Sequence, residues 1–174
     1  MRLFHSRGYD AVGVAELGAE LGIKPPSFYA AFGSKAGLFE RAVEHYSTSD
    51  ANVFGRAKAL GGTVNEVIER MLLVAAEIYP EHDGVAGCLV LDGARNSADP
   101  EARAIIASYK KASRTALRDF IATGHPAKAE TLADLIVIAL EGMSGSARDG
   151  ASAAALKSFA EAIGRAFLRE AKQS

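Results

Sequence analysis

The sequence predicts an all-α fold, and three observations lead to that prediction. Apolar residues recur at three- and four-residue spacing in nearly every long segment, which is the period of an amphipathic helix. No segment keeps the strict alternation of a half-buried strand for long. Residues that open or end helices stand between these segments, among them Thr63 with Glu66, Asp99 with Pro100, and Gly124.

Composition narrows the class of protein. The 174 residues suffice for one medium domain, or for a small module joined to a larger one. A net charge of −1 does not by itself indicate a nucleic-acid partner. Cys88 is the only cysteine, which excludes an internal disulfide and is typical of a reducing compartment. Because no apolar run is long enough to span a bilayer and no signal peptide is evident, we expect a cytoplasmic protein without a membrane partner.

Several helices can be placed in the larger, C-terminal part. One begins at the capping box of Thr63 and ends near Pro80. The segment over residues 84–94, GVAGCLVLDGA, predicts a short buried helix, although its pattern also fits a strand. Asp99 and Pro100 then open a long helix. One side of that helix carries the residues Ile105, Tyr109, Ala112, Ala116 and Phe120.

The helix expected over residues 127–147 is apolar on more than one face, and such a helix needs more than one covering. Either it runs through the middle of the domain, or it packs on its own core and on another subunit. We favour the second arrangement, in which the last two helices form a four-helix interface across a two-fold axis. The predicted homodimer contacts are Leu135, Ile138, Phe159 and Ile163.

The stretch GIKPPSFYAAFGSK, residues 22–35, predicts the second helix of a helix-turn-helix. Gly22 ends a short amphipathic helix that carries Val14, Leu17 and Leu21, and Pro25 opens the next helix. Proline is harmless there because the first backbone N–H groups of a helix have no helical partner. The spacing turns Phe28 and Phe32 toward the core. The ring between them, Tyr29, is expected to face outward.

These features resemble the tetracycline-repressor (TetR) family of bacterial transcriptional regulators. The resemblance covers residues 3–43, LFHSRGYDAVGVAELGAELGIKPPSFYAAFGSKAGLFERAV, with a helix closed by Gly8 and a Ser-Lys start to the connecting helix. It implies a helix-turn-helix DNA-binding domain over residues 1–46 and an effector-binding and dimerisation domain over residues 47–174. It also implies a palindromic double-stranded operator as partner, and most of a first helix ahead of Arg2, a start that this sequence lacks.

The resemblance assigns the DNA contacts. Lys24, Pro26 and Ser27 would face base edges, Tyr29 would hydrogen-bond a phosphate, and Lys35 would hold the backbone at a helix N-terminus. Structural roles stay open for three of them: Tyr29 as a half-buried core ring, Lys35 as a solvated side chain, and Ser27 as a small surface residue.

Three departures from the family pattern predict fewer phosphate contacts and a shallower salt dependence. Val12 and Gly13 stand where the family usually has hydroxyl residues. Ala30 and Ala31 stand where it often has an aromatic residue and a histidine. Residues 1–46 carry five Lys or Arg and five Asp or Glu, so the module has no net charge.

The resemblance also implies a small-molecule effector bound between helices of the second domain. Large or polarizable residues on converging stripes are the candidates, and an ordinary core role stays open for each: Met71, Tyr79, Cys88, Tyr109 and Phe120. Since no charged cluster lies among them, we expect an apolar, repressor-releasing ligand. The alternative is a helical small-molecule-binding protein or enzyme whose truncated module no longer binds DNA.

We expect no enzymatic activity, cofactor or metal. The run around Ser144, GMSGS, approaches a nucleophile elbow but has serine at its last position and lies in a predicted helix. Phosphate-loop, dinucleotide-binding and zinc-protease motifs are lacking.

Overall fold

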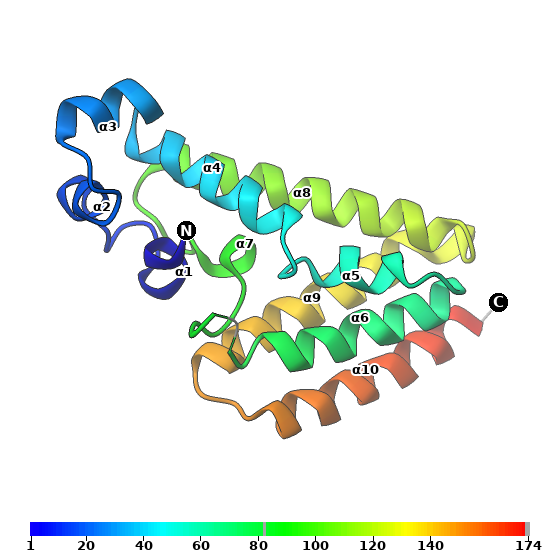
Figure 1. Ribbon diagram of the computed structural model, residues 1–174. Coiled ribbons are helices and arrows are strands. Elements are labelled where there is room, and N and C mark those ends of the chain that lie inside the picture. The colour runs from blue at the N-terminus through cyan, green and yellow to red at the C-terminus, as the bar shows by residue number, and fades with distance from the viewer. Residues whose placement is uncertain (82, 173–174) are drawn as a thin grey trace.

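The computed structural model describes residues 1–81 and 83–172, and every regular element among them is a helix, as predicted (Figure 1). The N-terminal elements are α1 (Arg2–Arg7), α2 (Val14–Glu20), α3 (Pro25–Phe32) and α4 (Lys35–Thr48). The middle of the chain forms α5 (Val53–Ala59), α6 (Val64–Ile78), α7 (Leu89–Asp92) and α8 (Pro100–Ala122). A 3-10 helix, η1 (Pro126–Lys128), precedes α9 (Ala129–Arg148) and α10 (Ala153–Lys172).

The helices form two groups that share α4 (Figure 1). α1, α2 and α3 gather at one end of the molecule, and α4 leads from them to the rest. α8 packs against α4 and α9, while α10 packs along α6 and α9. The short α7 contacts α1 on one side and α8 and α9 on the other, so it lies between the two groups. A division of the chain at residue 46 stays a prediction, because α4 continues to Thr48.

Local signals in the sequence set several helix ends. The Thr63 side chain accepts a hydrogen bond from the N–H of Glu66, whose carboxylate accepts one from the N–H of Thr63. Asp99 caps α8 by accepting from the N–H of Glu101 at 2.8 Å. Gly8 ends α1 at a φ of +78°, where glycine is favoured. These predictions are confirmed because a capping residue acts on its own neighbours in the chain.

The segment over residues 84–94 is mostly a loop, so the prediction of a buried helix there was wrong for all but Leu89–Asp92. Gly84 and Gly87 adopt positive φ angles, which a helix cannot include. The backbone N–H of Cys88 donates to the Ser144 hydroxyl at 2.8 Å instead of to a helical carbonyl. This side-chain bond replaces the helical bond that the sequence pattern suggested.

Two predicted apolar stripes are displaced. In α8 the buried residues are Ala102, Ile106, Leu117 and Ile121. Ala112 and Ala116 of the predicted stripe are exposed, since alanines make two faces of this helix similarly apolar. Leu21 is 45% exposed because α2 already ends at Glu20.

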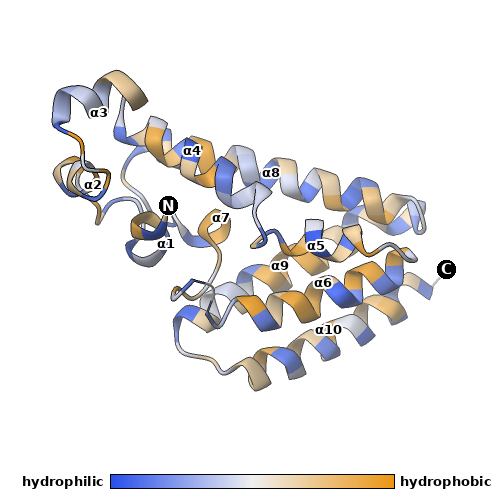
Figure 2. Ribbon diagram, in the orientation of Figure 1, coloured by the Kyte–Doolittle hydropathy of each residue, from blue (hydrophilic) through white to orange (hydrophobic). Residues whose placement is uncertain are grey.

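The core of the larger group lies between α6, α9 and α10. Figure 2 shows hydrophilic and hydrophobic residues sharing α10, as expected of a surface helix. Its buried positions are Leu156, Ala160, Gly164 and Phe167. Within the part of the chain that the structure describes, no helix has the length and apolarity needed to cross a bilayer.

Candidate DNA-binding surface and effector cavity

α2 and α3 form a compact helix-turn-helix. Gly22 takes a φ of +66° in the turn, and the N–H of Ile23 donates to the carbonyl oxygen of Gly18 at 2.9 Å. A Cβ atom at Gly18 would lie 3.0 Å from the carbonyl oxygen of Ile23, which is tighter than nearly all Cβ contacts. Glycine at position 18 therefore permits the turn to pack closely against α2.

The rings of α3 divide between core and surface. Phe28 is fully buried, and Phe32 is half-buried at 5.2 Å from it between ring centroids. Tyr29 is 52% exposed, so the alternative that it is a half-buried core ring is not supported. Lys24, Pro26 and Ser27 are exposed as well, at the start of the helix. Four of the five predicted DNA contacts thus lie together on the surface of the module.

Lys35 lies differently. It is the first residue of α4, after Ser34, whose side chain caps that helix by accepting from the N–H of Gly37 at 3.0 Å. Its Nζ sits 4.0 Å from the centroid of the Tyr9 ring, in a half-buried position. Burial lowers the pKa of Lys35, and the nearby Asp10 carboxylate opposes that shift. The ammonium therefore has partners within the protein and does not simply project into solvent.

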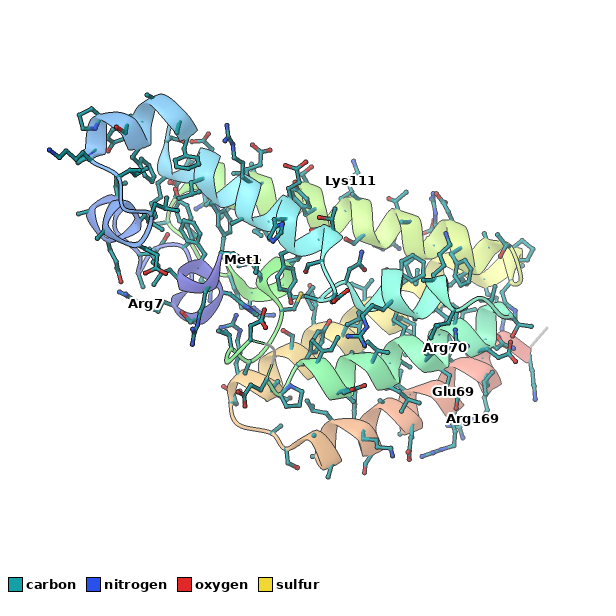
Figure 3. The ribbon with its side chains drawn as sticks, viewed as in Figure 1. Met1, Arg7, Glu69, Arg70, Lys111 and Arg169 are labelled. Carbon is teal, nitrogen blue, oxygen red and sulfur yellow. The ribbon has the colours of Figure 1, made fainter. Side chains whose placement is uncertain are left out.

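Other cations of the module are also engaged. Arg7 lies on α1 at the margin of the molecule (Figure 3), where it pairs with the carboxylate of Glu16 and donates to the carbonyl oxygen of Ala11 at 2.7 Å. The guanidinium of Arg41 lies 5.3 Å from the centroid of the Phe32 ring. This surface consequently has little unpaired positive charge to attract a polyanion.

A cavity of about 360 Å³ opens between α4, α5, α6, α7, α8 and α9. Four of the predicted effector residues line it: Met71, Tyr79, Cys88 and Tyr109. The fifth, Phe120, does not; its ring packs at 5.6 Å against Phe54, which does line the cavity. Burial raises the pKa of the Cys88 thiol, so the thiol stays protonated near neutral pH.

Charged residues around the cavity are paired with one another. Lys110 Nζ lies 2.8 Å from Glu141 Oε1. Arg114 contacts Asp134 at 2.7 Å and Glu130 at 2.8 Å. Among the described residues, no cluster of His, Cys, Asp and Glu could hold a metal ion. The cavity is thus an apolar chamber with ion pairs at its margin.

The outer face of α9 and α10 is unusually apolar for a surface. Ile138 is 68% exposed and Phe159 is 43% exposed, while Leu135 and Ile163 are half-buried. Gly142 lies one turn beyond Ile138, and a Cβ atom added there would meet nothing within 4 Å. The four residues predicted at a dimer interface, which do not include Gly142, therefore remain partly uncovered within one protomer: Leu135, Ile138, Phe159 and Ile163.

A polar network that the sequence did not suggest connects the cavity to α1. The Ser144 hydroxyl accepts from the N–H of Cys88 and donates to Asp92 Oδ2. Arg148 Nε contacts the same Asp92 oxygen at 3.0 Å, and Arg148 Nη2 donates to the carbonyl oxygen of His5 at 2.8 Å. Ser144, which the sequence did not favour as a nucleophile, lies fully buried near the C-terminal end of α9. Its partners are 52 and 56 residues away, beyond the reach of a local motif.

Comparisons with known proteins agree with this architecture. Residues 1–42 match the family model described as bacterial regulatory proteins, tetR family. The chain is 42% identical over 165 residues to the HTH-type transcriptional repressor BdcR of Escherichia coli (strain K12), covering 95% of this chain and 83% of the relative. The chain belongs to the TetR family.

Two further comparisons support the membership of this TetR-family chain. The HTH-type transcriptional repressor ComR of Escherichia coli (strain K12) is 27% identical over 168 residues, covering 87% of this chain and 77% of the relative. Among solved structures, a cysteine mutant of the TetR family transcriptional regulator CifR superimposes with a TM-score of 0.84 and 28% identity. It covers 94% of this chain and 90% of that one, and it is complexed with 26-bp double-strand operator DNA.

Proposed function

We propose that this chain is a ligand-responsive, cytoplasmic DNA-binding repressor, which binds a palindromic operator as a homodimer and is released by a small apolar molecule. The observation that carries the proposal is the start of α3. There a proline-opened helix, anchored by the buried Phe28, exposes Lys24, Pro26, Ser27 and Tyr29 on one small surface. The CifR complex supports it, because a chain of the same fold is bound to operator DNA.

The four exposed residues have distinct roles in the proposal. Ser27 and Lys24 offer a hydroxyl and an ammonium to base edges in the major groove, with Pro26 in van der Waals contact. Tyr29 donates its phenolic O–H to a phosphate, which fixes the position of the helix without reading sequence. Lys35 adds a second phosphate contact only when its ammonium leaves the Tyr9 ring.

Two copies are needed for a palindromic site. The uncovered apolar face of α9 and α10 packs against its own copy around a two-fold axis. The recognition helices then reach successive major grooves when they stand about 34–36 Å apart. A change of a few ångströms in that separation is enough to prevent simultaneous contact.

Release follows from a shift between two conformations. A ligand in the cavity contacts the segment around Cys88, which is tied through Ser144 and Asp92 to Arg148, and from there to α1. A conformation that fits the ligand and moves α7 therefore also moves the module. The ligand can shift the equilibrium between the two conformations by no more than the ratio of its affinities for them.

The test is fluorescence anisotropy of labelled duplexes from the region upstream of the protein's own gene. We expect specific binding of a duplex with inverted repeats and competition by unlabelled copies, but weak binding of a scrambled duplex. The measurement should be made at low salt and repeated over a salt series, since the module has few free cations. Equal affinity for the palindromic and scrambled duplexes at every salt concentration would contradict the proposal.

A second candidate, a ligand-binding protein without DNA-binding activity, is favoured by one observation. Residues 1–46 carry no net charge, and Arg7 is already paired with Glu16. The same titration distinguishes the two functions, since only the repressor binds any duplex specifically. Metabolites that raise the melting temperature identify ligands under either function.

A further inference from the structure

Each charged side chain that the structure describes at the cavity is already paired with an opposite charge. Lys110 is held by Glu141, and Arg114 is held by two carboxylates. The other lining residues are mostly apolar or aromatic. An ionised group brought into such a chamber would lose its hydration without a partner to replace it, which is strongly unfavourable. The cavity is therefore suited to a neutral molecule.

One polar atom in the cavity wall lacks a hydrogen bond. Among the described residues, the hydroxyl oxygen of Tyr46 is the buried side-chain atom without a hydrogen-bond partner. Tyr46 lines the cavity near the C-terminal end of α4. The residue is only 2% exposed to solvent. Buried polar groups in native proteins are nearly always paired, so such an exception points to a functional partner.

The surroundings of Tyr46 define what that partner must offer. Burial raises the pKa of Tyr46, and the neighbouring Cys88 adds to the shift, so the phenol keeps its proton. The Cys88 thiol and the Leu89 backbone lie close enough to the hydroxyl to act on this pKa. Neither contact has the distance and angles of a formed hydrogen bond. The Tyr46 and His5 rings pack edge to face with 5.3 Å between their centroids, which restrains the Tyr46 side chain. What remains is an O–H donor on a mostly apolar wall.

We propose that the effector is a neutral, largely apolar small molecule with one carbonyl-type oxygen, which accepts a hydrogen bond from the Tyr46 hydroxyl. This inference rests on the proposed function, because it specifies the ligand of the same cavity. The cavity volume of about 360 Å³ lies at the small end of ligand sites, which suits a molecule of one or two rings. Since the Cys88 thiol is protonated and buried, binding is reversible and forms no bond to sulfur.

Matched probes test the acceptor. Acetophenone carries its carbonyl beside the aromatic ring, and indanone carries its carbonyl within the fused five-membered ring. Ethylbenzene and indane are the corresponding hydrocarbons without the carbonyl. Benzoate has a similar size and a full negative charge. Isothermal titration calorimetry on the full chain should give affinities about three- to tenfold higher for each ketone than for its hydrocarbon, as one neutral hydrogen bond provides. Benzoate should bind at least tenfold more weakly than acetophenone.

Two variants assign the effect to Tyr46. Tyr46→Phe removes only the hydroxyl, and the ratio between ketone and hydrocarbon affinities should fall to about one. Tyr29→Phe is the matched control, because it removes the same hydroxyl from an exposed ring on α3 that does not line the cavity; its ratio should equal that of the wild type. Circular dichroism melts confirm that both variants fold.

Several results would overturn the inference: an unchanged ratio in Tyr46→Phe, benzoate binding as tightly as acetophenone, or no binding of either ketone up to its solubility. The operator titration separates this failure from that of the proposed function. Specific operator binding with no preference for ketones rejects the inference alone. Ketone binding through Tyr46 that leaves operator affinity unchanged supports Tyr46 as the donor to a cavity ligand and rejects ligand-controlled release.

Discussion

Arg148 of α9 donates a hydrogen bond to the backbone carbonyl oxygen of His5 in α1, over 2.8 Å and across 143 positions of sequence. The same guanidinium contacts Asp92, whose side chain is 5% exposed. One side chain thus joins the helix that borders the cavity and the outer apolar face to the first helix of the DNA-binding module. This contact gives a physical route for coupling between ligand and DNA.

Replacing Arg148 should uncouple the two sites. Arg148→Ala removes the donor to His5 and leaves Asp92 with Arg95 as its remaining ionic partner. We expect the free energy of unfolding to fall by about 1–3 kcal/mol. Operator affinity should then become nearly independent of ligand, measured as the ratio of dissociation constants with and without a cavity ligand. Arg165→Ala, an exposed position of α10, is the control and should keep the wild-type ratio.

Lys35 and Ser27 should affect DNA binding in different ways. Lys35→Ala removes one phosphate contact, so binding to all sequences weakens alike and the slope of log affinity against log salt decreases by about 1. Ser27→Ala removes a group facing the bases, and should change the preference among operator variants with little effect on that slope. Anisotropy titrations over several salt concentrations measure both quantities. Equal losses on cognate and random duplexes from both variants would refute the assignment.

The outer face of α9 and α10 predicts a dimer that one charge can disrupt. Ile138→Glu places a carboxylate twice in a symmetric interface, and should weaken association by about 2–4 kcal/mol. Analytical ultracentrifugation should then show monomers at concentrations where the wild type is dimeric. Leu60→Glu is a matched control, because Leu60 is 74% exposed but lies after α5, away from this face. If both variants remain dimeric, another surface forms the interface.

Acid should loosen the contact between the module and α8. The Tyr9 hydroxyl donates to Asp99 at 2.8 Å and lowers the pKa of Asp99 below its ordinary value of 3.8. Because this pKa is lower in the folded chain, its contribution to stability is present above pH 3.8 and is lost as pH falls through the folded-state pKa. Tyr9→Phe should therefore flatten the fall in melting temperature at low pH. A parallel fall in the variant and the wild type would exclude this link.

Features of the fold could be predicted where the interacting residues are close in sequence, and were missed where they are far apart. The caps at Thr63 and Asp99 and the exposed Tyr29 were predictable because each depends on neighbours within one helical turn. The buried side of α8 was not, since its alanines make alternative faces similar in hydropathy. The loop before α7 was missed because its N–H groups bond to residues far along the chain, as Cys88 does with Ser144.

The candidate sites divide in the same way. The start of α3 follows from local pattern, whereas the partner of Lys35, the ring of Tyr9, depends on how α1 and α4 meet. No local motif marks Tyr46, because the absence of a hydrogen bond is visible only when every neighbour is placed. Four of the five residues chosen for the cavity do line it, but their role in binding an effector stays a prediction.

Helix α9 carries Ser144 on its buried side and Ile138 on its uncovered side. In a symmetric dimer, a ligand that displaces α9 by filling the cavity also displaces the surface against which the other protomer packs. The second cavity would then be reshaped before it is filled, so the pair would switch as a unit. The dose-response of release would accordingly be sigmoidal, with a Hill coefficient between 1 and about 2.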